Sequence, residues 1–405
     1  MKRIHYGWII VGVGLMVKMA ALGFGRFAYA MLLSSMRISL DFNYIQMGLL
    51  SGGILLGYLL FSFIGGTLAT KLGAKRIVVA SLFCSAISMF ILSRLSGFIP
   101  LLCFTFAMGG AAAGAHISMT TLPMAWFEKR RLGRALGVVT GGTGLGIIVT
   151  GLILPYLLSS LGREAWRQCW ALLSLITMMV AIGSLILLKE RPDQALPLSC
   201  GSDGSSGPLF HEKKGDGLTL NAIIIIYFIF GFAYNIYATY FVAFTVEEVQ
   251  LPGKVAGFIW SIFGWMCLVS GLAWGFLSDH FGRRRALLWN NSLISVAVVI
   301  PLLFHQSFFL GISTFLFGFT FLGTITIVAA CVGELVVEKR ASVYGLVTLI
   351  HGIGQFLGTT LGGYLKDLTG TFHLTLLSSL VGFLLCCILI LFNPSSLASR
   401  RPAEG

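Results

Sequence analysis

Two cations inside an apolar run are the residues of this chain best suited to binding chemistry. Residues 6–36 read YGWIIVGVGLMVKMAALGFGRFAYAMLLSSM, long enough to cross a bilayer, which takes about 20 apolar residues. The run nevertheless contains Lys18 and Arg26. A cation in hydrocarbon costs at least about 2.5–3.5 kcal/mol, so it normally faces water or a partner.

On a helical wheel Lys18 and Tyr29 share a stripe with two glycines, and Arg26 lies about 80° from Lys18. The pattern predicts a helix that lines a path through the membrane. The alternative is that Lys18 extends its stem to the interface and Arg26 anchors the helix end.

Arg26 also indicates the charge of a ligand for such a path. The guanidinium group offers a planar fork of donors that matches a carboxylate. The chain has fifteen Asp and Glu, and only Glu334 falls close to a membrane interior. Because no carboxylate is expected beside Arg26, the sequence favours an anion over a cation as the bound species.

Other polar side chains inside apolar runs complete the predicted binding site. Together with Arg26 and Tyr29 they are His116, Tyr234, Asn235, His351 and Gln355. Each also has a purely structural interpretation. His116 can bond a neighbouring backbone, Tyr234 and Asn235 can join helices, and His351 lies in a glycine-rich stretch where helices pack closely. A histidine titrates near neutral pH, so proton coupling through a histidine stays open.

The composition identifies an integral membrane protein. Of 405 residues 57% are apolar and 11% charged, against about 25% charged in a soluble domain. The net charge of +13 is spread over short loops, so no nucleic-acid partner is expected. The eight cysteines form no CxxC or Cys/His cluster, and we expect neither a metal nor a cofactor. No nucleophile–base pair stands out, so an enzyme is not predicted.

Hydropathy predicts an all-α membrane protein with twelve transmembrane helices, since an isolated strand cannot satisfy its backbone in lipid. The predicted spans are 6–36, 44–69, 76–95, 99–124, 135–159, 168–189, 218–246, 256–278, 286–304, 307–332, 341–366 and 372–393. Residues 191–217 are rich in Gly, Ser, Pro and charge and are predicted to be a flexible linker. The linker separates two six-helix bundles, 1–190 and 218–405.

With the N-terminus inside, twenty Lys and Arg fall on the inner side and six on the outer. Both termini and the linker are therefore predicted to be cytoplasmic.

The two bundles repeat each other in sequence. The segment GTLATKLGAKR, 66–76, recurs as GFLSDHFGRRR, 275–285, and GVVTGGTGLG, from 137, recurs as GLVTLIHGIG, from 345. The offsets are 209 and 208 residues, and an offset of 208 places Arg26 opposite Tyr234. Such a repeat is typical of a pseudo-symmetric transporter whose site lies near the midplane between the halves. The glycine run 141–146 superficially resembles a dinucleotide-binding loop, but it lies inside a span, so we expect helix packing there.

The segment 275–285 resembles the loop signature of the major facilitator superfamily between the second and third helices of each half. Its recurrence extends the resemblance over essentially the whole chain. The start HYGWIIV and the late basic residue of the first span resemble the monocarboxylate and oxalate/formate transporter branch, while GFGRFAYAMLL also resembles uncharacterised bacterial facilitators. The resemblance implies a monomeric, alternating-access transporter of a bacterial inner membrane. It assigns conformational switching to Gly66, Thr70, Gly73, Asp279, Gly282 and Arg283.

Two departures from the family pattern affect these expectations. Thr70 stands where the family usually has Asp, which weakens the switching role of the first loop. The monocarboxylate branch usually carries an Asp–Arg pair in its eighth helix, and 256–278 has none, so proton coupling by that route is in doubt. The leading prediction is a secondary transporter for a mono- or dicarboxylate. The alternative is an exporter of neutral or amphiphilic compounds, favoured by the 32 Phe residues. A membrane sensor is disfavoured because the chain has no soluble effector domain.

Overall fold

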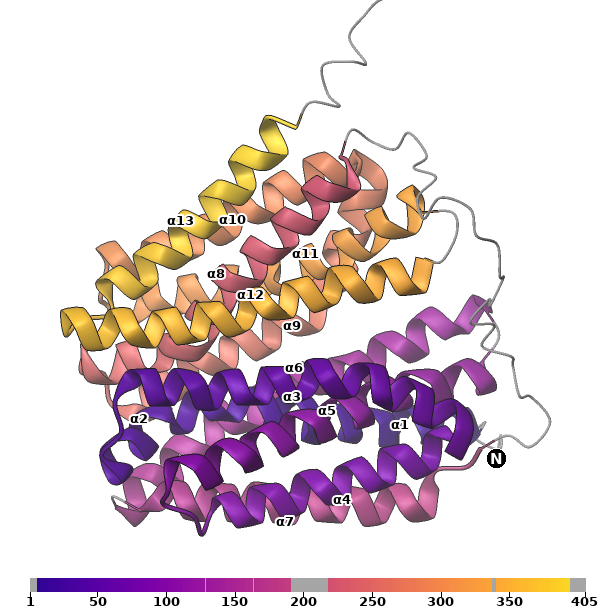
Figure 1. Cartoon of the computed structure of the whole chain (residues 1–405), viewed down its shortest axis with the longest axis horizontal. Coiled ribbons are helices and arrows are strands. Elements are labelled where there is room, and N and C mark those ends of the chain that lie inside the picture. Colours follow the sequence, from indigo (N-terminus) through magenta and orange to yellow (C-terminus); the bar gives the residue numbers. More distant parts are fainter. Residues whose placement is uncertain (1–5, 128, 163, 191–217, 337–339, 394–405) are drawn as a thin grey trace, which may run out of the picture.

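A computed structural model of the chain describes residues 6–127, 129–162, 164–190, 218–336 and 340–393. The predicted linker 191–217 therefore lies outside the described residues. Within the described ranges all regular elements are helices (Figure 1). The predicted all-α class is confirmed.

The first span is one continuous helical passage with a change of pitch in its middle. It consists of α1 (Tyr6–Lys18), the π-helix η1 (Met19–Phe27) and α2 (Ala28–Leu40). At the end of η1 the N–H of Ala28 donates to the carbonyl of Gly23, five residues back. A π-helix has more residues per turn than an α-helix. The wheel angles computed at 100° per residue therefore do not apply beyond Lys18, and the predicted common stripe is not found. Lys18 bonds to α5, whereas the Tyr29 hydroxyl donates to the carbonyl of Met47 on α3.

Each other predicted span corresponds to one long helix. These are α3 (Tyr44–Leu72), α4 (Ala74–Leu92), α5 (Phe98–Trp126), α6 (Lys129–Leu161), α7 (Ala165–Leu187), α8 (Leu220–Glu247), α9 (Gly253–Phe281), α10 (Arg283–Leu303), α11 (Ser307–Leu335), α12 (Arg340–Thr369) and α13 (His373–Leu391). Eleven passages in the described ranges are long and apolar enough to cross a membrane, counting α1, η1 and α2 as one. The passage outside that set is α12, which is 30 residues long but interrupted by glycines and polar residues. It tolerates them because it packs between α3 and α8.

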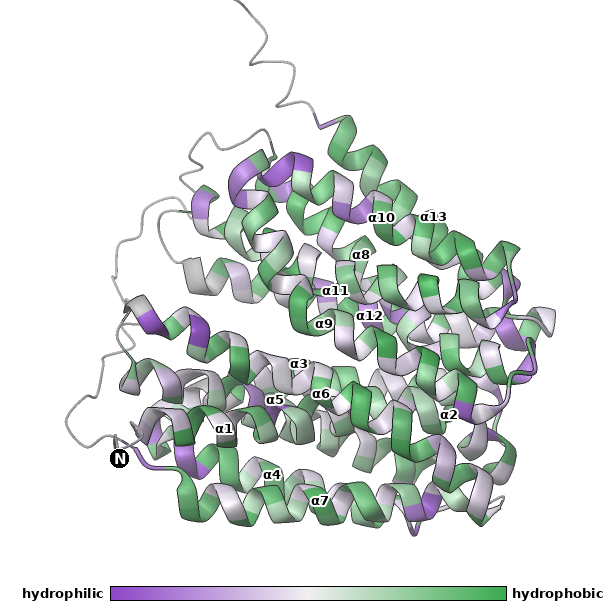
Figure 2. Cartoon of the chain, turned by 180° about the vertical axis from the view of Figure 1, so that it is seen from behind, coloured by the Kyte–Doolittle hydropathy of each residue, from purple (hydrophilic) through white to green (hydrophobic). Residues whose placement is uncertain are grey.

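The helices form two groups that meet along a central plane (Figure 1). We call α1–α7 the first half and α8–α13 the second half; the exact domain limits 1–190 and 218–405 stay predictions. Across the plane α3 packs on α12, α6 on α9, and α2 on α8. The helices consist largely of apolar residues (Figure 2), and many large apolar side chains are exposed, as expected of helices that face lipid.

Close backbone approach sets the packing in the middle of the molecule. A Cβ built on Gly23 would lie 2.5 Å from the Cα of Gly146. Gly146 ends the glycine run 141–146, which lies inside α6. The expectation that this run serves helix packing is confirmed.

At the end where α2 stops and α3 starts, polar contacts join the two halves. The Asp367 carboxylate accepts hydrogen bonds from the backbone N–H groups of Tyr44, at 2.9 Å, and Ile45, at 2.7 Å. A carboxylate is favourable there because the first N–H groups of a helix have no intrahelical partner. Arg37 forms an ion pair with Glu247 at 3.2 Å, also across the plane. This end of the interface is held closed.

Candidate functional site

Arg26 lies at the contact between the halves, where three predicted site residues come together. It belongs to η1 and is half-buried. Its Nη2 donates to the hydroxyl of Tyr234 on α8, at 2.6 Å, and to Oε1 of Gln355 on α12, at 2.7 Å. Both partners are neutral and buried. The guanidinium is thus bound by neutral groups of the opposite half.

The remaining surroundings of Arg26 are aromatic rather than acidic. Its Cζ lies 5.4 Å from the ring centre of Phe27 and 5.8 Å from that of Tyr58, a range in which a cation is attracted to a ring. Among the described residues no ion pair of Arg26 with a carboxylate is found. Among the described residues, no hydrogen bond from Nε or Nη1 of Arg26 is found. Both hydrogen bonds from Arg26 to the second half thus use the same nitrogen, Nη2.

The space beside Arg26 is too small for an organic ion in this conformation. A cavity of about 20 Å³ holds about one water. Its lining comes from η1, α2, α3 and α8: Arg26, Phe27, Tyr29, Ala30, Ser51, Ile54, Leu55, Asn235, Ala238 and Thr239. A larger ligand requires the halves to separate.

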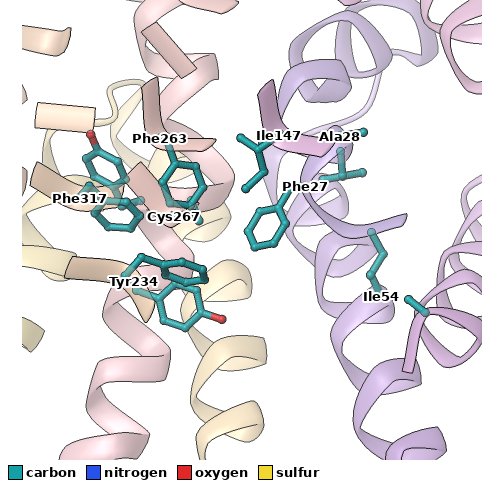
Figure 3. Packing of buried hydrophobic residues seen from close by; sticks show 14 of the residues in the cluster. Phe27, Ala28, Ile54, Ile147, Tyr234, Phe263, Cys267 and Phe317 are labelled. Carbon is teal, nitrogen blue, oxygen red and sulfur yellow. The ribbon is translucent and has the colours of Figure 1, made fainter. Parts of the chain in front are cut away.

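Aromatic rings close the interface next to this cavity. Phe27 lies edge-on to Phe263 and to Phe321, each at 5.9 Å between ring centres. Phe321 in turn lies 5.1 Å from Tyr234. Figure 3 shows Phe27 and Ile147 of the first half facing Phe263 and Tyr234 of the second. These rings pack the two halves together beside the Arg26 site.

Asn235 and Tyr29 line the cavity but use their polar groups elsewhere. The Asn235 amide donates to the backbone carbonyl of Gln355, at 3.3 Å, and so joins α8 to α12. The Tyr29 hydroxyl is 2.7 Å from the carbonyl of Met47. Asn235 thereby positions the segment that carries the Gln355 side chain.

Neither histidine is hydrogen-bonded to Arg26, although the ring of His351 stacks on that of Tyr234 at 5.6 Å. Nδ1 of His116 lies 2.7 Å from Nζ of Lys18. His351 is buried, its Nδ1 is 2.8 Å from the carbonyl of Tyr227, and its ring stacks on that of Tyr227 at 3.8 Å. These contacts join α12 to α8, and a role of His351 in the binding site stays a prediction.

Sequence analysis did not identify two residues that structure this region. Tyr58 places its ring between Arg26 and His116, 6.2 Å from the imidazole ring. Thr120 accepts a hydrogen bond from Lys18 at 2.9 Å. The sequence could have pointed to Thr120 through its spacing, because a residue four positions after His116 lies on the same helix face. The only sequence signal for Tyr58 was that a tyrosine stands inside an apolar span.

The repeated loop segments each contain a glycine in a backbone conformation that other residues rarely adopt. Gly73 ends α3 with φ of 95°, and Gly282 ends α9 with φ of 88°. Gly66 lies within α3. In the second loop Arg283 bonds to Asp279 and forms an ion pair with Glu334 at 2.8 Å. This loop is locked to α11 of its own half.

The first loop uses a different acid. The Thr70 hydroxyl donates to the carbonyl of Thr67 in its own helix, at 2.7 Å, and so takes no part in an ionic contact. Instead, Oε1 of Glu190 accepts a hydrogen bond from the N–H of Lys75 at 2.8 Å. Glu190 directly follows the sixth passage, so a carboxylate from another element stands at the start of α4. The sequence signal for Glu190 was only its place at a helix end.

Comparisons with known proteins agree with this architecture. A hexuronate transporter of Bacillus subtilis (strain 168) is 25% identical over 356 residues, covering 81% of this chain and 80% of that protein. Monocarboxylate transporter 13 of Rattus norvegicus is 26% identical over 320 residues, covering 76% and 71%. The crystal structure of a mutant of the nucleoside transporter NupG superposes with a TM-score of 0.79 at 13% identity, covering 94% of this chain and 99% of that one.

The family model described as "Uncharacterised MFS-type transporter YbfB" matches residues 18–391, from the buried lysine of the first passage to the last helix. The match spans both halves and includes Arg26 and both loop segments. The chain belongs to this family of the major facilitator superfamily and is a multi-pass membrane transporter.

Proposed function

We propose that this chain moves a small organic anion, a mono- or dicarboxylate, across the membrane, with Arg26 as the anchor for the carboxylate. The observation that supports the proposal is the contact of Arg26 with Tyr234 and Gln355. A cation at the plane between the halves is satisfied by neutral groups of the opposite half, with no acid among the described residues around it.

The same contact suggests how the anion takes part in alternating access. When the halves separate, Arg26 loses Tyr234 and Gln355 together. A desolvated cation without a partner is costly, so water or an anion must replace them. A carboxylate replaces them through two parallel charge-assisted hydrogen bonds. Binding thus favours the open state and links the anion to the movement of the halves.

The names of relatives support an anionic substrate class. Hexuronate and monocarboxylates are both carboxylates, and they are the substrates in the names of the two relatives described above. We extend this only to the class, since the identities are 25% and 26%.

We further propose that the protein lies in a bacterial inner membrane as a monomer, with both termini cytoplasmic. The excess of Lys and Arg on the side of the N-terminus supports this orientation. The closed end, with Arg37 and Glu247, then faces outward. A monomer is sufficient because one chain supplies both sides of the Arg26 site.

Uptake into proteoliposomes tests the proposal. Radiolabelled D-glucuronate, L-tartrate and L-lactate are compared with the neutral compounds D-glucose and uridine, using wild type, Arg26→Gln and the exposed control Arg94→Gln. We expect saturable uptake of at least one acid by wild type and Arg94→Gln, and its loss in Arg26→Gln. Uptake of the neutral compounds alone contradicts the proposal and supports an exporter or importer of uncharged molecules. Undiminished acid uptake by Arg26→Gln shows that Arg26 is not the anchor.

A further inference from the structure

Lys18 is a second cation inside the first half, and its site differs from that of Arg26. It ends α1 and is 2% exposed. Its Nζ lies 2.7 Å from Nδ1 of His116 and donates to Oγ1 of Thr120 at 2.9 Å. The Thr120 hydroxyl itself donates to the carbonyl of His116, at 2.8 Å, which leaves its lone pairs for the lysine. The amine is thus held by two neutral acceptors on α5.

No anion balances Lys18 among the described residues. On the other side of its stem α6 presents the backbone of Gly142, where a Cβ would lie 2.9 Å from that of Lys18. The elements that pack on α1 are α5, α6, α7 and η1. Their titratable or charged side chains whose surroundings are described are His116 and Cys103 on α5, Arg131, Arg134 and Tyr156 on α6, Arg167 and Cys169 on α7, and Arg26 on η1, and Tyr58 of α3 contacts His116. None of these is a carboxylate.

Two bases at this distance are suited to hold one proton between them. With one proton, the ammonium donates to the imidazole nitrogen and to Thr120. With none, the neutral amine still donates to one of them, so the contacts persist while the charge changes by one. A second proton would place two cations side by side in a site poor in water, which is strongly unfavourable. Lys18 is buried but His116 is half-buried, so the imidazole offers the proton a way in and out.

We propose that Lys18 and His116 form a proton-binding site that holds a single shared proton and makes transport proton-coupled. The site itself stands on its own geometry, whereas its coupling to an anion rests on the function proposed above for Arg26. The proton enters as H⁺ from water, binds the free amine and leaves as H⁺, so no further reactant is needed.

The position of the pair accounts for coupling through charge. Lys18 and Arg26 are eight residues apart on one passage, so they lie on the order of 10 Å apart along the axis, somewhat less than the roughly 12 Å of an α-helix because η1 has more residues per turn. The ring of Tyr58 lies between His116 and Arg26. At an effective dielectric constant of about 20, a unit charge at that distance changes the affinity for an anion about tenfold. The protonated pair therefore favours an anion at Arg26, and the neutral pair favours its release.

Potentiometric titration of the purified protein in detergent between about pH 5 and 9 tests the site without any anion. We expect wild type minus the double variant Lys18→Met/His116→Gln to give a step of about one proton, because with Lys18 alone removed His116 can still bind a proton. His116→Gln should keep that step at a displaced pH, because Lys18 still titrates but has lost its partner. The matched control is Lys254→Met, which replaces an exposed lysine of the second half and should give a flat difference from wild type. Size-exclusion profiles and thermal unfolding establish that each variant is folded.

Two results overturn the proposal: a flat difference between wild type and the double variant, or a step that disappears in His116→Gln and keeps both its size and its pH in Lys18→Met. The latter means that His116 titrates alone. If Lys18→Met does not fold, the wild-type and His116→Gln curves decide, because identical curves also contradict a shared proton.

A second measurement separates the proton site from the anion function. Proteoliposomes loaded with the pH dye pyranine report proton movement during uptake of D-glucuronate or another acid that wild type transports. We expect about one proton per anion in wild type and none in Lys18→Met. Anion uptake without the titration step leaves the Arg26 proposal standing and removes the proton site. If the titration step is found but no acid is taken up, the proton site stands and the Arg26 proposal is removed.

Discussion

Arg26 and Tyr234 occupy equivalent positions in the two halves, 208 residues apart, and their side chains meet with 2.6 Å between Nη2 and the hydroxyl oxygen. Halves of this kind are related by a pseudo-twofold axis along the membrane normal. Two equivalent residues can touch only close to that axis. The contact therefore locates Arg26 at the centre of the molecule, where a ligand can reach both halves.

Replacing Arg26 with Lys separates the effect of charge from that of the donor fork. Lysine keeps the positive charge but cannot bind a carboxylate through two parallel bonds. We expect Arg26→Lys to retain partial uptake, and Arg26→Gln to lose about 30- to 1,000-fold in affinity, corresponding to about 2–4 kcal/mol. Calorimetric titration of both variants with the transported acid measures the difference. Equal affinities of the Lys and Gln variants would show that charge at this position is irrelevant.

Tyr234→Phe should destabilise the closed state that the structure represents. The change keeps the ring that packs on Phe321 and removes one hydrogen bond to a charged group, which contributes about 1.5–3 kcal/mol. We expect a lower midpoint of thermal unfolding in the absence of substrate. The control Tyr156→Phe removes an exposed hydroxyl and should leave the midpoint unchanged. A midpoint for Tyr234→Phe equal to that of wild type argues against a contribution of this bond to stability.

Gly23→Ala tests whether the close crossing of η1 and α6 is required. The new methyl group would lie 2.5 Å from the Cα of Gly146, so the two helices must move apart. We expect a reduced yield of folded protein by size-exclusion chromatography. Gly12→Ala is the matched control, since nothing lies within 4 Å of its Cβ position. Alanine there should be neutral or stabilise by up to about 1 kcal/mol. Equal yields of the two variants would show that the crossing tolerates a side chain.

The two loop segments should differ in their sensitivity to mutation. Asp279 bonds to Arg283, whereas the Thr70 hydroxyl bonds only within its own helix. We expect Asp279→Asn to reduce the initial rate of uptake more than Thr70→Ala. Rates measured at matched amounts of reconstituted protein decide this. A similar loss in both variants would mean that the charge of Asp279 has no special role in switching.

The proposed orientation predicts which surface lysines are accessible from outside the cell. In a variant without its native cysteines, Lys254→Cys should react with a membrane-impermeant maleimide in intact cells. Lys71→Cys should react only after the cells are opened. Both positions are exposed, so burial does not explain a difference. Labelling of Lys71→Cys in intact cells would reverse the orientation.

The sequence by itself determined the class of protein and the repeat. An apolar run of about 20 residues must form a helix in lipid, because only a helix satisfies all backbone hydrogen bonds within one segment. The 208-residue offset was sufficient to place Arg26 opposite Tyr234, because a symmetric pair needs only the register of the repeat. Gln355 was identified as a polar residue in an apolar run, although its bond to Arg26 was not foreseen.

The tertiary structure decided how the polar residues are grouped. The sequence pattern placed Lys18 and Tyr29 on one helical stripe, with Arg26 about 80° from Lys18. The nine residues of π-helix between Lys18 and Ala28 change these directions, and that segment packs against α5 and α6. The tertiary structure also separated the two histidines, which lie on α5 and α12. His116 meets Lys18, and His351 meets the backbone of Tyr227, because each faces a helix distant in sequence. Such contacts depend on the angles at which helices cross, which local periodicity does not encode.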